Sequence, residues 1–291
     1  MTIFKGAGTA IITPFDENGN VDYLRLEKLV DFQIENGIDS IIVCGTTGES
    51  ATLTDDEQIK CIKTVVKRVK GRVPVIAGTG KNSTAKSIEL SKKAEKLGAD
   101  GLLLVTPYYN KGTQEGLIKH FCEISRSVNI PSIVCNVPSR TGINLLPETV
   151  LKLIKKSKNI VGIKEASGDI RQIVRLMALC EGKIDVYAGN DDHIVPVLAV
   201  GGIGAISVAS NVIPGEIHNL VMNYLNGNIE ESVKIQLKYT KLFDLLSAEV
   251  NPIPIKAAAS ILGLSENILR LPLTPLSAKY EKELKKLLIK E

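Results

Sequence analysis

Residues 132–166 read SIVCNVPSRTGINLLPETVLKLIKKSKNIVGIKEA, and this stretch decides the fold. It begins with a short apolar run, continues through an amphipathic segment that Pro147 opens, and ends in a second apolar run. The two runs, Ser132–Pro138 and Ile160–Ala166, are continuous rather than alternating, which is typical of parallel strands buried on both faces. The stretch therefore predicts a strand–helix–strand unit with parallel strands.

Six more runs of the same kind are distributed along the chain. They span Gly8–Pro14, Ser40–Gly45, Val73–Gly78, Gly101–Pro107, Ile184–Gly189 and Gly204–Ser210. Helical patterns separate the runs, and one of them starts with a capping box formed by Thr54 and Glu57. Eight buried strands alternating with about eight helices fit an open doubly wound sheet or a closed barrel, and the count of eight favours an α/β fold of the (β/α)8 TIM barrel type.

The end of the chain departs from this alternation. After the eighth run we expect a helix over Pro214–Leu225, followed by helical segments near Ile229–Leu246, Pro254–Leu262 and Pro275–Ile289. We therefore predict a catalytic (β/α)8 barrel over residues 1–226 and a C-terminal helical bundle over residues 227–291.

The composition of the 291-residue chain excludes several classes of function. Lys and Arg number 36 and Asp and Glu number 32, so the net charge is only +4. The charged residues are scattered along the chain and do not form blocks, which argues against nucleic acid or a membrane as partner. The apolar stretch 194–213 contains Pro196 and several glycines, so no transmembrane helix is predicted. The N-terminus lacks the pattern of a secretory signal, and we expect a cytoplasmic protein.

Metals and cofactors are not expected. The five cysteines are odd in number and form no CxxC motif, and the three histidines are far apart, which argues against disulfides and zinc. GTGKNS at Gly78–Ser83 lacks the glycine spacing of a phosphate loop, and GGIGAIS at Gly201–Ser207 lacks that of a dinucleotide fingerprint. The sequence thus predicts a site without metal or cofactor.

In a TIM barrel the active site lies at the carboxyl ends of the strands and on the loops that follow them. In this sequence those positions carry mostly polar residues, namely Thr46, Thr47, Glu49, Thr79, Tyr108, Tyr109, Asn136, Arg140, Lys164, Glu165, Asn190 and Asp191. We therefore expect a polar active site assembled from several strand ends.

Lys164 is the candidate for the reacting group. It lies within NIVGIKEASG at Asn159–Gly168, where a charged ammonium inside the barrel would be unfavourable unless it were paired. Desolvation lowers the pKa of an amine and frees its lone pair to attack a carbonyl, as a Schiff-base nucleophile requires. The alternative is a strand lysine whose ammonium reaches solvent. Lys256, in NPIPIK, has a comparably apolar setting, but it lies in the helical tail and is a weaker candidate.

Two further motifs are suited to carboxylates. GTTGES at Gly45–Ser50 places hydroxyls and the amides of small residues at a strand end, although a plain turn is the alternative. Arg140, in VPSRTG, is either a guanidinium for bidentate carboxylate binding or an ordinary surface arginine. The pair Tyr108 and Tyr109 is suited to proton relay and is conspicuous because aromatic residues make up only 4% of the chain.

Six motifs follow one another over nearly the full chain: GTTGESATL, VIAGTG, TPYYN, NVPSRTG, GIKEASG and NPIPIK. In this order they strongly resemble the dihydrodipicolinate synthase (4-hydroxy-tetrahydrodipicolinate synthase) family, within the N-acetylneuraminate lyase group of pyruvate-dependent class I aldolases on a TIM barrel. The resemblance implies a lyase that condenses pyruvate with L-aspartate 4-semialdehyde, the first committed step toward diaminopimelate and lysine.

The resemblance also implies catalytic roles. Lys164 attacks the pyruvate ketone to form an imine, which loses a methyl proton to give the enamine that attacks the semialdehyde. Thr47 and the amides of the GTTG loop hold the pyruvate carboxylate. Thr46 and Tyr109 belong to a proton relay, and Tyr109 reaches into the site of a neighbouring subunit. The resemblance therefore implies a homo-oligomer that is at least a dimer, with a homotetramer built as a dimer of dimers expected.

Three further positions are assigned by resemblance. Arg140 binds the semialdehyde carboxylate at the mouth of the pocket, and the backbone near Gly189 and Ile206 lines it.

Position 135 departs from the family pattern. Where the family reads Tyr-Asn-Val-Pro, this chain reads Cys135-Asn136-Val137-Pro138, so the central tyrosine of the relay is missing. A thiol is shorter than a phenol, with a reference pKa of about 8.5 rather than about 10. Because loss of a positioned acid or base typically costs about 10²–10⁴ in rate, we expect imine formation to survive and turnover to be weak unless water bridges the gap.

Feedback regulation is expected to differ as well. Lysine-inhibited members place a glutamate on the helix after GTG, and Lys86 matches that position here. Asp55 and Gln58 stand where such members often carry histidines. Because Lys86 repels the ammonium of the effector, we expect insensitivity to L-lysine.

Two other functions stay open. A related aldolase that acts on a 2-keto-3-deoxy sugar acid or on N-acetylneuraminate would share Lys164, although GTTGES, the tyrosine pair and Arg140 argue against it. A non-catalytic pyruvate-binding relative is compatible with Cys135. Screening of acceptors separates the two enzymes, and turnover separates an enzyme from a binder.

Overall fold

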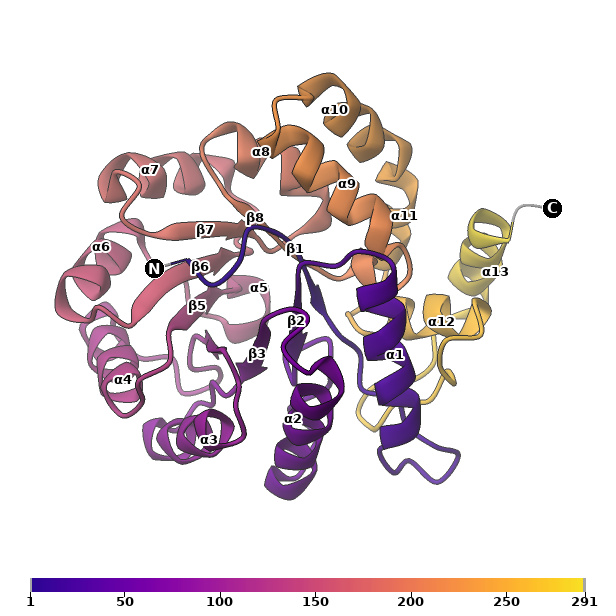
Figure 1. The fold of residues 1–291 in the computed structure, drawn as a ribbon, viewed down its shortest axis with the longest axis horizontal. Coiled ribbons are helices and arrows are strands. Elements are labelled where there is room, and N and C mark those ends of the chain that lie inside the picture. Colours follow the sequence, from indigo (N-terminus) through magenta and orange to yellow (C-terminus); the bar gives the residue numbers. More distant parts are fainter. Residues whose placement is uncertain (1, 290–291) are drawn as a thin grey trace.

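Eight parallel strands close into a barrel in the computed structural model, which describes residues 2–289 (Figure 1). The strands are β1 (Gly6–Ala10), β2 (Ser40–Val43), β3 (Val75–Gly78), β4 (Gly101–Val105), β5 (Ser132–Asn136), β6 (Ile160–Glu165), β7 (Asp185–Ala188) and β8 (Gly204–Ser207). Each strand pairs with its neighbours in sequence, and β8 pairs with β1 to close the ring. The predicted (β/α)8 TIM barrel is confirmed.

Helices alternate with the strands and surround the barrel (Figure 1). They are α1 (Tyr23–Glu35), α2 (Asp55–Val69), α3 (Thr84–Lys96), α4 (Gln114–Arg126), the single turn α5 (Pro138–Thr141), α6 (Pro147–Lys156), α7 (Ile170–Cys180), η1 (Asp191–His193), α8 (Ile194–Ala199), η2 (Ala209–Asn211) and α9 (Pro214–Leu225). Thr54 and Glu57 form the predicted capping box of α2, and Pro147 opens α6 as expected.

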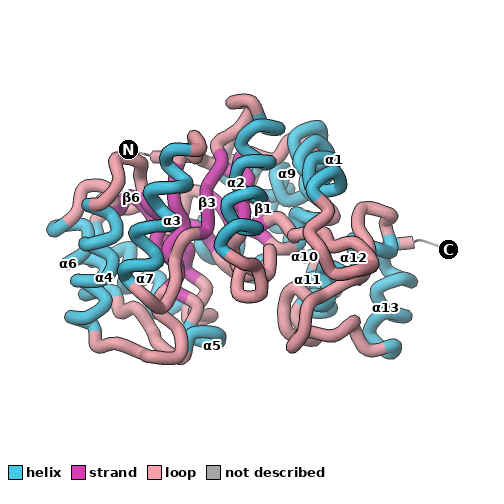
Figure 2. Tube along the Cα trace, turned by 90° about the horizontal axis from the view of Figure 1, so that it is seen from below, coloured by secondary structure: helices cyan, strands magenta, loops and turns pink. Residues whose placement is uncertain are grey.

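Four helices follow the barrel: α10 (Ile229–Lys238), α11 (Thr240–Leu246), α12 (Ile253–Ile261) and α13 (Ala278–Leu288). The single helix expected over Ile229–Leu246 is divided at Tyr239, because the backbone leaves helical geometry there and Thr240 Oγ1 donates back to the Gln236 carbonyl at 3.2 Å. In Figure 2 these helices lie to one side of the barrel, with α11 toward the same end as α5. The boundary between residues 226 and 227 stays a prediction.

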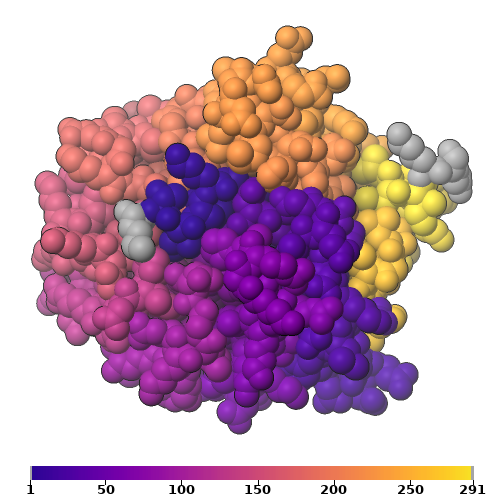
Figure 3. All heavy atoms as spheres, viewed as in Figure 1, coloured from indigo at the N-terminus to yellow at the C-terminus, as the bar shows by residue number. Residues whose placement is uncertain are grey.

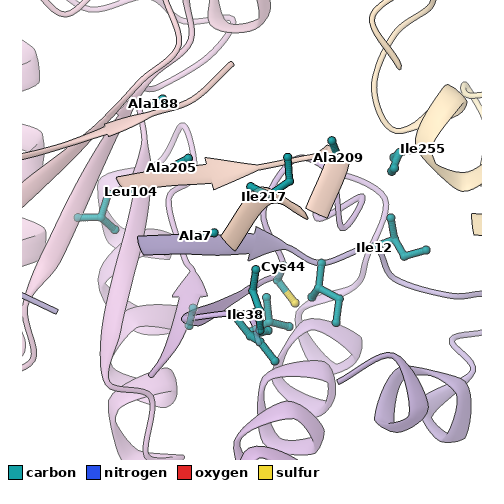
Figure 4. Close-up of a cluster of buried hydrophobic side chains, with 14 of the residues drawn as sticks. Ala7, Ile12, Ile38, Cys44, Leu104, Ala188, Ala205, Ala209, Ile217 and Ile255 are labelled. Carbon is teal, nitrogen blue, oxygen red and sulfur yellow. The ribbon is translucent and has the colours of Figure 1, made fainter. Parts of the chain in front are cut away.

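The first strand lies earlier than the sequence predicts. The apolar run Gly8–Pro14 was expected to form it, whereas β1 ends at Ala10. Beyond that point the Ile12 N–H leaves the sheet and donates to Asn211 Oδ1 at 3.0 Å. Ile12 is apolar because it packs in the core shared with the tail, where Ile255 of α12 also lies (Figure 4).

A smaller apolar cluster fills the barrel interior and closes its N-terminal end. The ring of Tyr187 stacks on that of Phe4 with centroids 4.6 Å apart, and its hydroxyl donates to the Phe4 carbonyl at 2.7 Å. In Figure 3 the indigo N-terminal segment lies over the middle of this face. The interior is therefore accessible from the carboxyl ends of the strands.

Within residues 2–289, no helix combines the length and the apolar character that crossing a membrane requires.

Candidate active site

A cavity of about 880 Å³ opens at the carboxyl ends of the strands. Its walls come from the loops after β2, β5 and β7 and from Phe243 and residues 246–251 of the tail. The predicted site residues that line it are Thr46, Thr47, Cys135, Arg140, Lys164 and Gly189. A volume of this size is typical of small-molecule sites.

Lys164 projects into the barrel interior. Cys135, Lys164 and Tyr187 are register partners on β5, β6 and β7, so their side chains point to the same face of the sheet. Within residues 2–289 the Lys164 ammonium forms no ion pair. Burial lowers the pKa of Lys164, and the neighbouring Cys135 and Asp191 oppose that shift. The lysine is thus a desolvated amine facing a cavity, as the nucleophile hypothesis requires.

Cys135 lies beside this amine and is only 6% exposed. Burial raises the pKa of its thiol, and Lys164 opposes the shift. Ile206, expected to line the pocket, is fully buried in the interior cluster with Cys135 and Tyr187. Val208, just beyond β8, lines the cavity, because the strand ends at Ser207 and the chain turns there. A contact of the backbone near Ile206 with substrate stays a prediction.

The GTTG loop, Gly45–Gly48, has the form of an anion-binding turn. Two non-glycine residues in the left-handed region flank it, Cys44 with φ of 57° and Glu49 with φ of 53°. The backbone N–H groups of Thr46 and Thr47 find no acceptor within residues 2–289. Successive N–H groups at a turn form a concavity that suits a carboxylate.

The tail fixes the end of this loop through a buried ion pair. Lys256 Nζ donates to Glu49 Oε1 at 2.7 Å, and both side chains are 0% exposed. The Arg270 N–H donates to Glu49 Oε2 at 3.2 Å, and Lys256 also donates to the Thr13 carbonyl at 3.0 Å. Burial lowers the pKa of Lys256, whereas Glu49 raises it. Lys256 therefore shapes the loop, and Lys164 is the amine that faces the cavity.

Replacing Lys256 with methionine is expected to lower the free energy of unfolding by about 3–5 kcal/mol, because the Glu49 carboxylate is left buried without its partner. Urea denaturation followed by circular dichroism measures the change. The matched control is Lys93→Met, which breaks the exposed pair of Lys93 with Glu89 and should cost less than about 1 kcal/mol. Equal costs for the two substitutions would contradict a structural role for the buried pair.

Asn251 connects the two groups suited to carboxylates, and the sequence did not single it out as a site residue. Its Nδ2 donates to Thr47 Oγ1 at 3.0 Å, and its carbonyl accepts from Arg140 Nη2 at 2.7 Å. The only signal for it in the sequence is its place in the NPIPIK motif. Through Asn251 the tail positions Thr47 and Arg140 at the mouth of the cavity.

Tyr109 is not among the residues that line this cavity. Its side chain is 90% exposed, and its φ of 70° places it in the left-handed region. Its action in the site of a neighbouring copy stays a prediction.

Some of the strand-end residues hold the scaffold instead of facing the cavity. Asn136 and Glu165 follow Cys135 and Lys164, so they point outward, and Asn136 Nδ2 donates to the Glu165 carboxylate at 3.1–3.2 Å. The Gly189 N–H donates to the Glu165 carbonyl at 2.8 Å, and a Cβ at position 189 would lie 2.8 Å from that same oxygen. Only glycine permits this close approach.

The residues that the structure describes contain no group of three or more His, Cys, Asp or Glu side chains arranged to hold a metal ion.

Comparison with known proteins gives one consistent result. The chain is 55% identical to the 4-hydroxy-tetrahydrodipicolinate synthase of Caldicellulosiruptor saccharolyticus over 289 residues, which cover 99% of this chain and 97% of that one. The dihydrodipicolinate synthase structure from Thermotoga maritima superposes with a TM-score of 0.96 at 48% identity, covering 99% and 98% of the two chains. The chloride-inhibited dihydrodipicolinate synthase from Acinetobacter baumannii, complexed with pyruvate, gives a TM-score of 0.96 at 42% identity and covers 99% and 98%. The model of the dihydrodipicolinate synthetase family matches residues 3–291, and the chain therefore belongs to this family.

Proposed function

We propose that the chain condenses pyruvate with L-aspartate 4-semialdehyde to give 4-hydroxy-tetrahydrodipicolinate, a step of diaminopimelate and lysine biosynthesis. The observation that carries the proposal is the desolvated Lys164 amine in a cavity that also contains a turn suited to a carboxylate. The names of the relatives and the pyruvate complex of the Acinetobacter baumannii enzyme support the choice of substrates.

In the proposed reaction Lys164 forms an imine with the pyruvate ketone, while Thr47 and the amides of the GTTG loop hold its carboxylate. Arg140 binds the carboxylate of the semialdehyde. Arg140 and Thr47 are both bonded to Asn251, so the two carboxylate positions are fixed relative to each other. Holding two reactants at fixed relative positions in this way converts a bimolecular step into an effectively unimolecular one.

The proposed enzyme acts in the cytoplasm as a homotetramer built from two dimers. In this assembly Tyr109 reaches the site of a neighbouring copy and joins Thr46 in proton relay. Its 90% exposure supports this placement, because a large aromatic side chain so fully exposed is suited to contact with a partner.

The test is reductive trapping followed by turnover. The protein is incubated with pyruvate and borohydride, and intact mass is expected to rise by one reduced pyruvyl group. Product formation from pyruvate and aspartate semialdehyde is then measured beside pyruvate with N-acetylmannosamine and pyruvate with glyceraldehyde. Absence of an adduct overturns the imine, an adduct without turnover supports a pyruvate binder, and preference for a sugar acceptor supports the related aldolase.

L-Lysine at millimolar concentration is expected to leave activity unchanged. Lys86 on α3 is exposed near Lys81, so an incoming ammonium meets positive charge where inhibited members carry a glutamate. Gln58 is buried and already donates to the Gly78 carbonyl at 2.6 Å. A lysine titration of the turnover assay checks this, with Lys86→Glu as the variant expected to gain affinity for lysine. Loss of activity of the parent protein in the titration would refute the prediction.

A further inference from the structure

Asp191 holds a carboxyl group rigidly at the wall of the cavity that contains Lys164. It begins η1, three residues after the end of β7 at Ala188. Its Oδ2 accepts the N–H groups of Val208 at 3.1 Å and Ala209 at 2.9 Å, and its carbonyl accepts from Gln236 Nε2 of α10 at 3.0 Å. The chain just after β8 therefore orients the carboxyl, and the tail holds the backbone of Asp191.

The second carboxyl oxygen of Asp191, Oδ1, is not bonded by the Val208 and Ala209 amides that hold Oδ2. Oδ1 is buried, and within residues 2–289 it forms no hydrogen bond. A buried polar atom without a partner is unfavourable, and such an atom in a folded protein requires an explanation. Because Asp191 lines the cavity, a molecule bound there is the natural partner of Oδ1.

The groups that face Asp191 favour proton exchange over a permanent ion pair. Lys164 on β6 is close enough to act on its charge, but the two form no direct ion pair within the described residues. Burial raises the pKa of Asp191, while the Ser207 side chain, the Ala209 and Val208 N–H groups and, least, the Lys164 charge oppose that shift. Burial lowers the pKa of Lys164. Both shifts favour the neutral amine and the neutral acid. The other titratable residues that line this cavity are Cys44, Cys135, Arg140, Asp192 and Glu249.

Glu165, the buried carboxyl that follows Lys164, is already fully engaged. Glu165 points away from the barrel interior, and its oxygens accept from Asn136 Nδ2, the Ser167 N–H and Gln172 Nε2. Asp191 is thus a half-buried carboxyl of this cavity whose Oδ1 atom forms no hydrogen bond among residues 2–289.

We propose that Asp191 exchanges protons with pyruvate bound to Lys164 and supplies acid and base chemistry from the loop that follows β7. This inference rests on the proposed imine chemistry and assigns it a residue. In this chain a thiol occupies the position of the family tyrosine, so a second proton-transfer group has a clear role.

The proton transfers balance with the groups present. The neutral Lys164 amine adds to the keto carbon and gives a carbinolamine. The Asp191 carboxyl donates its proton to the carbinolamine hydroxyl, the C–O bond breaks, and water leaves an iminium cation beside a carboxylate. That carboxylate then takes a proton from the methyl group, and the C–H electron pair forms the enamine double bond and neutralises the nitrogen. The same proton is available for the alkoxide that forms when the enamine attacks the aldehyde.

The test is exchange of the pyruvate methyl protons in D2O, followed by proton NMR without any second substrate. The unmodified protein is expected to exchange them, because enamine formation is reversible. Asp191→Asn keeps the size of the side chain and an oxygen for the Val208 and Ala209 amides, and it is expected to slow exchange and kcat by about 10²-fold or more with little change in the KM for pyruvate. The matched control Asp244→Asn removes an exposed carboxyl of α11 outside the cavity and should leave both rates unchanged.

The outcomes distinguish this inference from the function on which it rests. Undiminished methyl exchange by folded Asp191→Asn overturns the role of Asp191 and leaves the proposed function intact. Neither borohydride adduct nor exchange with the unmodified protein overturns both. Retained adduct with lost exchange supports Asp191. If Asp191→Asn does not fold, Asp191→Glu and Asp191→Gln, which are equal in length, make the same comparison, and the inference requires that only the glutamate variant exchanges.

Discussion

Replacing Lys164 with methionine is expected to abolish the pyruvate adduct and to lower kcat by roughly 10³-fold or more, the scale on which removal of a covalent nucleophile acts. Methionine has a similar length and apolar character, so it fits the cavity wall and removes only the amine. Borohydride trapping read by intact mass and steady-state turnover measure the two effects. Lys158→Met is the control, because Lys158 is exposed just before β6 and should keep both adduct and turnover.

The pH dependence of trapping follows from the same amine. An amine attacks a carbonyl only when it is neutral, and burial lowers the pKa of Lys164 below the ordinary lysine value of about 10.4. The adduct should therefore form at pH values below the ordinary lysine range and decline as the pH falls further and the ammonium forms. An adduct that persists in Lys164→Met would place the nucleophile elsewhere and end the proposal.

Replacing Cys135 with tyrosine is expected to raise kcat by about 10²-fold or more, because a phenol would supply the proton-transfer group that the resemblance implies at this position. Cys135 lines the cavity, so a larger ring can extend into it without displacing the strand. The yield of the borohydride adduct should change little, since Lys164 is unaltered. Turnover with pyruvate and aspartate semialdehyde is the measurement.

Cys135→Phe is the matched control, because it adds the same ring without the hydroxyl and should give no gain. A rise in kcat with phenylalanine would attribute the effect to packing, and no rise with tyrosine would refute the hypothesis that the thiol limits turnover. If Asp191 serves where the phenol is missing, Asp191→Asn should cost less in the Cys135→Tyr background than in the parent protein. A double-mutant cycle measures that difference.

The barrel could be predicted because strands buried on both faces leave continuous apolar runs, and the observed strands coincide with the predicted runs from β2 onward. The first strand was misplaced for a physical reason. Gly6 and Gly8 give β1 no apolar signal, while Ile11 and Ile12 are apolar because they pack in the core next to the tail. A short apolar run in the sequence does not distinguish residues buried against a helix from residues buried in a sheet.

The sequence predicts the part of the site that lies at the ends of the strands. Thr47, Lys164 and Gly189 line the cavity because carboxyl ends of parallel strands meet at one edge of a barrel. Asn251 was missed because its contacts join it to positions 204 and 111 residues away, and no local period reports such a contact. The partner of Glu49 was missed for the same reason, since the apolar setting of Lys256 gave no sign of a carboxylate.

The contribution of the tail also bears on protein design. Phe243 and residues 246–251 supply one wall of the cavity. Asn251 bridges Thr47 and Arg140, and Lys256 supplies the cation that neutralises Glu49. A designer who transplants only the strand-end side chains onto another eight-stranded scaffold would therefore carry over a buried anion without its counterion. A transplanted site would need the loops at the carboxyl ends of the strands together with the tail residues that contact them.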